Sequence, residues 1–272
     1  MSSPFHRRHF PDYFLSSPLA TLIYPLHQLL NHLRGPPHLP PPDAQPIRVV
    51  CISDTHTLEW PNIPDAPAKS KPPSIGSALS LILTKSPRTL TIYGAPQIPA
   101  IVPFGPEHAF TYPPHHDAWT NTIPPSTDIL ITHTPPQSHL DLSPVFSTGC
   151  PYLLSELWRV RPTLHVFGHV HAAYGIERVF YDEAQRAWEQ LCASRRRRAH
   201  ISRIGSLFGF VRDLFDISGI VNSARVLVYG VLGVVWARVW GGENRACGWV
   251  VNAACMYRDS GRLRNKPQVV VL

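Results

Sequence analysis

Two short apolar segments of this 272-residue chain end in residue types that bind metal ions. The first is followed closely by Asp54 and His56, and the second, which ends at Phe167, is followed by His169 and His171. Short apolar runs bounded by loops predict buried strands, and the ends of neighbouring strands meet at one edge of a sheet. Carboxylate and imidazole groups gathered there can share a divalent ion, so the pattern predicts a metal site.

A third apolar run ends in the same way. Residues 128–132 lead directly into His133, and the Thr-Pro-Pro that follows stops the strand because proline has no backbone N–H. One histidine among the 15 in this chain indicates little, but three predicted strand ends together indicate one centre. The candidate ligands are Asp54, His56, His133, His169 and His171.

The motifs around these residues resemble those of the calcineurin-like metallophosphoesterases, in the branch that includes the mammalian metallophosphoesterase-domain brain proteins. The resemblance rests on I-S-D-T-H, I-Y-G-A-P, I-L-I-T-H-T-P-P, R-P-T-L-H-V-F-G-H-V-H and V-N-A-A, within residues 47–60, 88–180 and 248–272. It implies an α/β fold of packed sheets flanked by helices, with metals at the strand ends. It also implies hydrolysis of a phosphomonoester or phosphodiester by a metal-bound hydroxide.

The resemblance assigns roles to individual residues. Gly168 would let the backbone pass close to the metals, and Asn252 and Tyr93 would line the substrate pocket. The metals would be Mn, Fe or Zn, as one or two ions. One ion would be held by Asp54, His56 and His171, and a second by His133 and His169.

The sequence departs from the family pattern between His56 and Tyr93. The family carries two further motifs there: G-D, whose carboxylate bridges both metals, and G-N-H, whose histidine acts on the leaving group. Neither is present in this chain. The family would also place two strand–helix units in this interval, so a block of the fold near 62–88 is expected to be missing.

The missing bridge changes the expected metal content. Two divalent ions about 4 Å apart repel by roughly 17 kcal/mol at an effective dielectric near 20, and Asp54 is the one recognised carboxylate that offsets this charge. Asp65, Asp117 and Asp128 match no family motif, and Asp128 opens its strand at the edge opposite His133. One ion is therefore favoured over two, and catalysis is a hypothesis because the leaving-group histidine is absent.

Two explanations account for the missing block. A transcript or gene model that skips an exon would leave the flanking motifs intact, with the join near 66–72. A degenerate relative would bind metal or phosphate without turnover and could be membrane-peripheral. Because all five candidate ligands are kept, the first explanation is favoured, and the sequence predicts a metallophosphoesterase-type hydrolase.

The composition indicates the class of protein, its cellular compartment and the kind of partner it suits. The 44% hydrophobic content is typical of a globular chain, and 30 prolines predict long irregular loops. Five cysteines without C-x-x-C spacing predict reduced packing thiols and an intracellular, cytoplasmic protein. The net charge of +7 suits an anionic partner, and a phosphoester small molecule fits better than nucleic acid because no nucleic-acid-binding module is found.

The apolar pattern predicts a layered α/β core. A helix is expected over 150–160, with Leu153, Leu154, Leu157 and Trp158 on one face and Pro162 at its end. The expected domains are a Pro-rich extension (1–46), the core (47–180), a helical Arg-rich insertion (181–247) and the last core strands (248–272). The expected strands are 48–53, 89–93, 128–132, 163–167, 249–252 and 268–272.

The insertion carries a second, separate signal. A helix over 181–192 precedes four arginines, and the apolar stretch after them is about a dozen residues between Arg225 and Arg238, short of the roughly twenty that span a bilayer. An interfacial helix in 195–240 on an anionic membrane and a helical hairpin packed on the core both fit this pattern. Segment 15–33 poses the same question, with Pro18 and Pro25 expected to break it.

Overall fold

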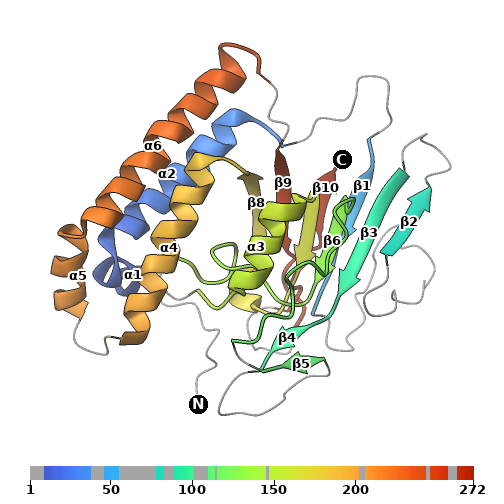
Figure 1. Ribbon diagram of the computed structural model, residues 1–272, viewed down its shortest axis with the longest axis horizontal. Helices are drawn as coiled ribbons and strands as arrows, with labels where there is room; N and C mark the ends of the chain where they lie inside the picture. The colour runs from blue at the N-terminus through green and yellow to red at the C-terminus, as the bar shows by residue number, and fades with distance from the viewer. Residues whose placement is uncertain are drawn as a thin grey trace.

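A computed structural model describes most of the chain (Figure 1). In residues 78–82, 197–201 and 206–209 it describes the backbone alone. The candidate ligand His56 lies outside the described residues. The described ranges are 9–37, 46–54, 78–82, 89–100, 110–113, 115–144, 147–201, 206–242, 246–256 and 262–272.

The centre of the fold is a six-stranded sheet in the order β2-β3-β6-β7-β9-β8. The four strands β3, β6, β7 and β9 run parallel, and β2 and β8 pair antiparallel at the two sides. The carboxyl ends of the parallel strands therefore meet at one edge. The strand bounds are β2 Ala78–Ile82, β3 Thr89–Ala95, β6 Ile129–Thr132, β7 Leu164–Phe167, β8 Gly175–Phe180 and β9 Cys247–Asn252.

A second, two-stranded sheet brings the first candidate ligand to the same edge. Its strands β1 (Arg48–Cys51) and β10 (Gln268–Val271) are antiparallel. Just after β1, Ser53 forms a parallel bridge with Ala254, which lies beyond the end of β9. A further short pair, β4 (Ile98–Pro99) and β5 (Thr111–Tyr112), follows β3.

Side-chain alternation along the strands builds two cores. Leu90, Ile129 and Val166 face the β1–β10 sheet, and the intervening residues face α3 (Pro151–Val160) and the loop around Trp119. The layered α/β class is confirmed, and so are the predicted strands, to within about two residues. The helix at 150–160 is also confirmed, with Leu153 and Leu157 buried.

A helical layer covers one side of the molecule (Figure 1). Trp188 and Leu191 of α4 pack with Ile23 of α2 and Val226 of α6 in a third apolar cluster. The helix predicted over 181–192 is confirmed and runs further, and all five cysteines are buried. The helix bounds are α1 Phe10–Ser16, α2 Pro18–Arg34, α4 Glu183–Ile201, α5 Ser206–Leu214 and α6 Ile217–Arg238.

Two expectations about these helices are wrong. Pro25 does not break the N-terminal segment: it lies inside α2, whose packing on α4 and α6 offsets the lost backbone hydrogen bond. Pro18 does separate α1 from α2, because it occupies the first turn of a helix that Ser17 caps. Likewise Arg225 does not end the apolar stretch, and α6 is a 22-residue helix long and apolar enough, by length and composition alone, to cross a membrane.

A buried ionic cluster joins the helical layer to the sheet. His139 Nδ1 lies 3.1 Å from Glu177 Oε2, and His139 Nε2 lies 3.2 Å from Glu189 Oε1. Tyr24 donates a hydrogen bond of 2.9 Å to Glu177, and Trp158 donates one of 2.6 Å to Glu189. Burial alone would lower the pKa of His139, but the two carboxylates outweigh it and raise the pKa from 6.5 to about 10.

This cluster predicts a loss of stability at alkaline pH. The folded pKa lies above the unfolded one, so the contribution of His139 is complete below pH 6.5 and is lost as the pH rises through about 10. Between those values the free energy of unfolding should fall by up to about 1.4 kcal/mol per pH unit. Urea unfolding at a series of pH values measures the slope. His139→Gln cannot titrate and should flatten it, whereas an equal slope in that variant would contradict the assignment.

Candidate metal centre

Asp54 and His171 meet at the edge where the parallel strands end. Asp54 Oδ1 lies 3.6 Å from His171 Nε2, and the two side chains are 4% and 12% exposed. The backbone of Asp54 is left-handed, with φ of 52°, which turns the chain sharply after the Ser53 bridge. His171 opens the short 3₁₀ helix His171–Ala173 that follows the Gly168 loop.

His133 and His169 form a second pair beside the first. Their ring centroids are 5.0 Å apart, and the Gly168 N–H donates to the His133 carbonyl at 3.4 Å. The His169 N–H donates to Asp54 Oδ2 at 3.0 Å, which links the two pairs through one carboxylate. The structure therefore brings together all four candidate ligands that it describes.

Asp54 is held as a charged group. Burial raises the pKa of this carboxyl, but His171, the hydroxyl of Ser53, the nearby imidazole of His133 and the His169 N–H lower it more, so the pKa lies well below the usual range. Ser53 Oγ donates to Asp54 Oδ2 at 2.7 Å. Ser53 was not among the predicted site residues, although its position directly before the aspartate in S-D was a usable signal.

Because Gly168 has no side chain, the carboxylate of Asp54 can lie directly against its backbone. A Cβ atom built on Gly168 would overlap Asp54 Oδ2 and Ser53 Oγ. Any other residue at position 168 would therefore push the carboxylate or the Gly168 loop out of place.

The described residues fit a metal ion in part. Ligand atoms bound to one ion at about 2.0 to 2.2 Å lie roughly 3 to 3.5 Å apart, close to the separation of Asp54 Oδ1 and His171 Nε2. A carboxylate with imidazoles suits Mn, Fe or Zn. Within the described part of the chain, however, no three His, Cys, Asp or Glu side chains are grouped so as to hold one ion.

Two other carboxylates do not replace the missing bridge. Asp128 Oδ2 accepts the Thr91 N–H at 2.8 Å at the amino end of its strand, as predicted from its position. Asp117 accepts the N–H groups of Trp119 and Thr120 in a turn. Asp65 lies outside the described residues.

The two predicted pocket residues, Asn252 and Tyr93, are both buried. Asn252 is fully buried, and its Nδ2 donates to the carbonyls of Val170 at 2.9 Å and Leu140 at 3.2 Å, so it holds the backbone just before His171. Tyr93 is 6% exposed and packs in the core between the sheet and α3. A substrate role for either residue stays a prediction.

His165, inside the same sequence motif, is a structural residue. Its ring is buried, and Nε2 lies 2.9 Å from the hydroxyl of Thr132 on the neighbouring strand. Burial, and then the charge of His139, lower its pKa to about 3, so the ring stays neutral.

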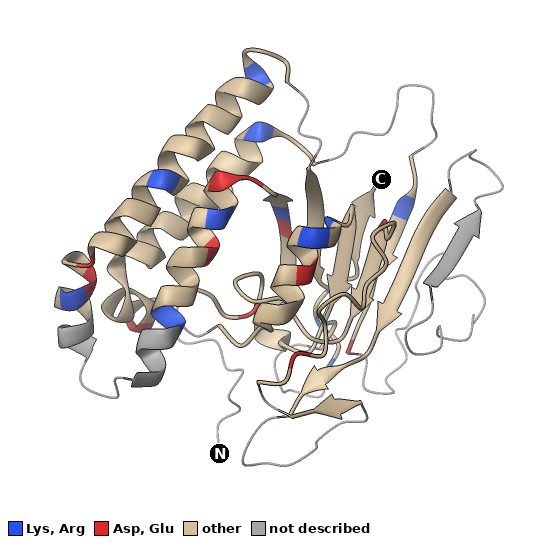
Figure 2. Ribbon diagram, in the orientation of Figure 1, with Lys and Arg blue, Asp and Glu red and all other residues tan. Residues whose placement is uncertain are grey.

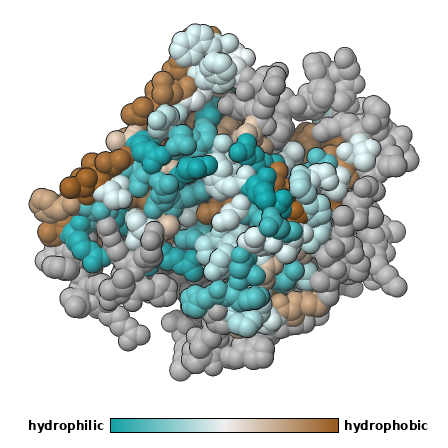
Figure 3. Space-filling view, viewed as in Figure 1, coloured by the Kyte–Doolittle hydropathy of each residue, from teal (hydrophilic) through white to brown (hydrophobic). Residues whose placement is uncertain are grey.

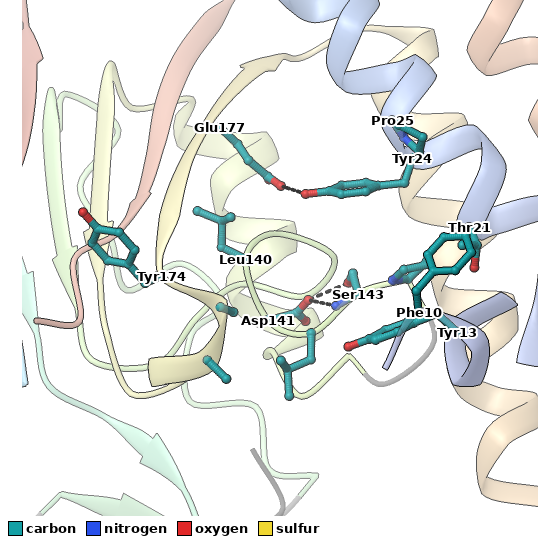
Figure 4. Close-up of a pocket in the computed structure, with 14 residues that line it drawn as sticks. Phe10, Tyr13, Thr21, Tyr24, Pro25, Leu140, Asp141, Ser143, Tyr174 and Glu177 are labelled. Carbon is teal, nitrogen blue, oxygen red and sulfur yellow. Dashed lines mark hydrogen bonds between the residues drawn. The ribbon is translucent and has the colours of Figure 1, made fainter. Parts of the chain in front are cut away.

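A cavity of about 400 Å³ lies between the first two helices and the loops around 140–144 and 172–174 (Figure 4). Its carboxylates are already engaged, since Glu177 accepts from Tyr24 and Asp141 accepts from Ser143. No Lys or Arg is among the described residues that line it, so it is poorly suited to a phosphoester. The lining approaches the metal-site residues at Ala172, next to His171 in the chain.

Comparison with curated proteins relates about a third of the chain to metallophosphoesterase-domain proteins. A segment of 95 residues is 42% identical to metallophosphoesterase domain-containing protein 1 of Homo sapiens and covers 33% of this chain and 28% of that protein. A segment of 91 residues, 32% of this chain, is 42% identical to a UPF0046 protein of Caenorhabditis elegans and covers 22% of it.

A match of 94 residues, 33% of this chain, is 46% identical to the probable rhamnogalacturonate lyase C of Emericella nidulans and covers 9% of that protein. The chain thus spans less than a third of the length of each of these relatives. No protein family model matches it.

Proposed function

We propose that the protein is a metal-dependent phosphoesterase that hydrolyses a phosphomonoester or phosphodiester. The observation that carries the proposal is the approach of Asp54 to His171, 3.6 Å apart, at a strand edge that also gathers His133 and His169. The similarity to a protein named for a metallophosphoesterase domain supports the same chemistry. In this proposal Asp54 and His171 hold the ion, together with His56.

In this proposal each side chain of the site has a role in binding the ion or the phosphoryl group. A bound divalent ion supplies activation of water and offsets the charge of the phosphoryl group. Asp54 contributes the negative charge, and Ser53 and the His169 N–H fix its Oδ2 so that Oδ1 faces His171. His133 and His169 lie side by side and either donate hydrogen bonds to phosphoryl oxygens or hold a second ion.

A second candidate function is metal or phosphate binding without turnover. It is favoured by the absence of G-D and G-N-H from the sequence and by the lack of a third ligand grouped with Asp54 and His171 in the described residues. Without the leaving-group histidine, proton transfer to the alkoxide would have no dedicated donor.

Turnover and binding are measured together in one experiment. Purified protein is assayed on bis-p-nitrophenyl phosphate and p-nitrophenyl phosphate with manganese, and melting curves are recorded with and without the metal. We expect turnover and a rise in melting temperature, because an ion that binds the folded state alone stabilises it. His171→Ala should abolish both, and His32→Ala, at an exposed histidine of α2, should change neither.

Each outcome decides between the functions. A melting-temperature rise without turnover would replace the enzyme with the binding protein. Neither a rise nor turnover, with Mn, Fe or Zn, would reject both the enzyme and the metal-binding protein. Turnover that survives in His171→Ala would reject the assigned site.

A further inference from the structure

Helix α6 turns small and polar side chains toward the protein and large apolar side chains toward the outside, the opposite of a helix on a water-exposed surface. Its buried positions are small or polar at Gly219, Asn222, Ser223 and Gly230, with Val226 as the one larger apolar residue. Its large exposed apolar side chains lie on the outside, where such a helix normally carries charged and polar groups. They include Ile217 at 76% exposure, Val228 at 56%, Leu232 at 51% and Trp236 at 52%.

The small inward residues serve close packing on α2. The side chain of Leu30 fills the space over Gly230, and the guanidinium of Arg34 lies over Gly233. Arg225 donates to Glu183 of α4 at 2.6 Å, and Arg238 donates to the Leu33 carbonyl at 2.7 Å. If α6 crossed a bilayer, these contacts with α2 and α4 would be broken. While α6 stays packed on the protein, its apolar outer side is still free to meet a membrane surface.

Helix α2 extends the apolar surface beyond α6. Leu22, Leu26, Leu29 and Leu33 are 42–53% exposed and follow one another at helical spacing. Leu30, which touches α6, has Leu26 four residues before it and Leu33 three residues after it, so the leucine stripe borders the α2–α6 contact. Hydrophobic atoms line the outer edge of the helical layer (Figure 3). The apolar face is defined by Leu22, Leu26, Leu29, Leu33, Ile217, Ile220, Val221, Val228, Val231, Leu232, Trp236 and Val239.

Within α2 and α6, the two helices that form the apolar face, the charges have one sign. No acidic residue lies in α2 or α6, whose ribbons carry no red (Figure 2). The acidic Glu183 of α4 is paired with Arg225 of α6. Asp213 and Asp216 at the α5–α6 corner are largely buried and pair with Arg195. Arg212 and Arg238 are exposed, and Trp236 and Trp240 lie beside Arg238 at the end of α6.

The arginine run at 195–198 was expected to supply the positive charge that meets a membrane, but the structure engages its first two members elsewhere. Arg195 is buried in ion pairs, and Arg196 donates to the Gly149 carbonyl at 2.9 Å, so these two members of the arginine run do not point at a partner. Among the side chains that the structure describes, the exposed arginines of α5 and α6 are Arg212 and Arg238. Arg238 donates to the Leu33 carbonyl through Nε alone, so its terminal nitrogens can still meet an anion. Tryptophan and arginine at the border of an apolar surface match the headgroup region of an anionic bilayer.

We propose that the apolar face docks on an anionic lipid surface, with α2 and α6 lying in the plane of the membrane. The aliphatic side chains enter the upper acyl region while Arg212 and Arg238 meet lipid phosphates. A second copy of the chain could cover the same side chains, but it would place cations opposite cations across a symmetric contact. The lipid surface is therefore the occupant that the charges favour.

Flotation of the full-length protein with vesicles tests the proposal. We expect binding to phosphatidylcholine vesicles that contain phosphatidylserine, and weaker binding to phosphatidylcholine alone. The triple variant Leu29→Gln, Val228→Gln, Leu232→Gln should bind about tenfold or more weakly. The control Val269→Thr, Val271→Thr changes exposed valines of β10 outside the apolar face and should bind as the unchanged protein does.

The circular dichroism spectrum and melting temperature of each variant establish that it folds. Absence of binding to either vesicle would overturn the proposal. Equal loss in the control variant would also overturn it, because the effect would not belong to the apolar face. A dimer seen by light scattering that the triple variant dissolves, without vesicle binding, would replace the lipid with a second copy.

Discussion

On the function proposed above, replacing Gly168 with alanine is expected to abolish the rise in melting temperature with manganese and to lower kcat/KM by about 100-fold or more. The added methyl group would overlap Asp54 Oδ2 and Ser53 Oγ, which are already joined by a hydrogen bond of 2.7 Å. Either the carboxylate leaves its place opposite His171 or the loop that carries His169 moves. A displacement of about 1 Å at a reacting group costs on the order of 100-fold in rate.

Gly175→Ala provides the matched control. A Cβ atom there would lie 3.3 Å from Leu140 Cδ2, the flexible end of a side chain that can move aside. We expect this variant to keep its metal response and its turnover. A normal metal response in Gly168→Ala would contradict the placement of Asp54 in the site, and equal losses in both variants would show that the effect is not specific to Gly168.

The position of the site could be predicted because it depends on strand ends. Each apolar run before Asp54, His133 and His169 is short. The parallel order of β6 and β7 brings His133 and His169 to one edge, and the bridge between Ser53 and Ala254 brings Asp54 there. The arrangement within the site could not be predicted. That Asp54 Oδ2 accepts from Ser53 and His169, while Oδ1 faces His171, depends on two left-handed backbone positions that sequence spacing does not reveal.

Two of the elements that were missed depend on partners far along the chain. Strand β8 carries Glu177 and Arg178 in its middle, which argues against a buried strand. Glu177 is nevertheless buried, because His139 and Tyr24 satisfy its carboxylate from 38 and 153 residues away. Helix α2 continues through Pro25 for a similar reason, since its contacts with α4 and α6 are made by residues far along the chain.

Arg195→Met is expected to cost about 3 to 5 kcal/mol in the free energy of unfolding. The guanidinium lies 2.6 Å from Asp213 Oδ1 and 2.5 Å from Asp216 Oδ2, with all three side chains largely buried. Removing one partner leaves two buried carboxylates without their cation, which is the costly case for buried ion pairs. Asp213 Oδ2 also accepts from Ser17 Oγ and the Leu19 N–H, so the start of α2 depends on the same group.

The neighbouring arginine separates this effect from a general loss of charge. Arg196→Met removes one hydrogen bond to the Gly149 carbonyl and should cost about 1 kcal/mol. Adding Asp216→Asn to Arg195→Met should recover part of the loss, because asparagine keeps the cap on the Gly219 N–H while removing a buried charge. Urea unfolding at neutral pH measures all three variants. If Arg195→Met costs no more than Arg196→Met, the cluster does not hold α2, α4 and α6 together, and the in-plane docking of α2 with α6 would lose its rigid support.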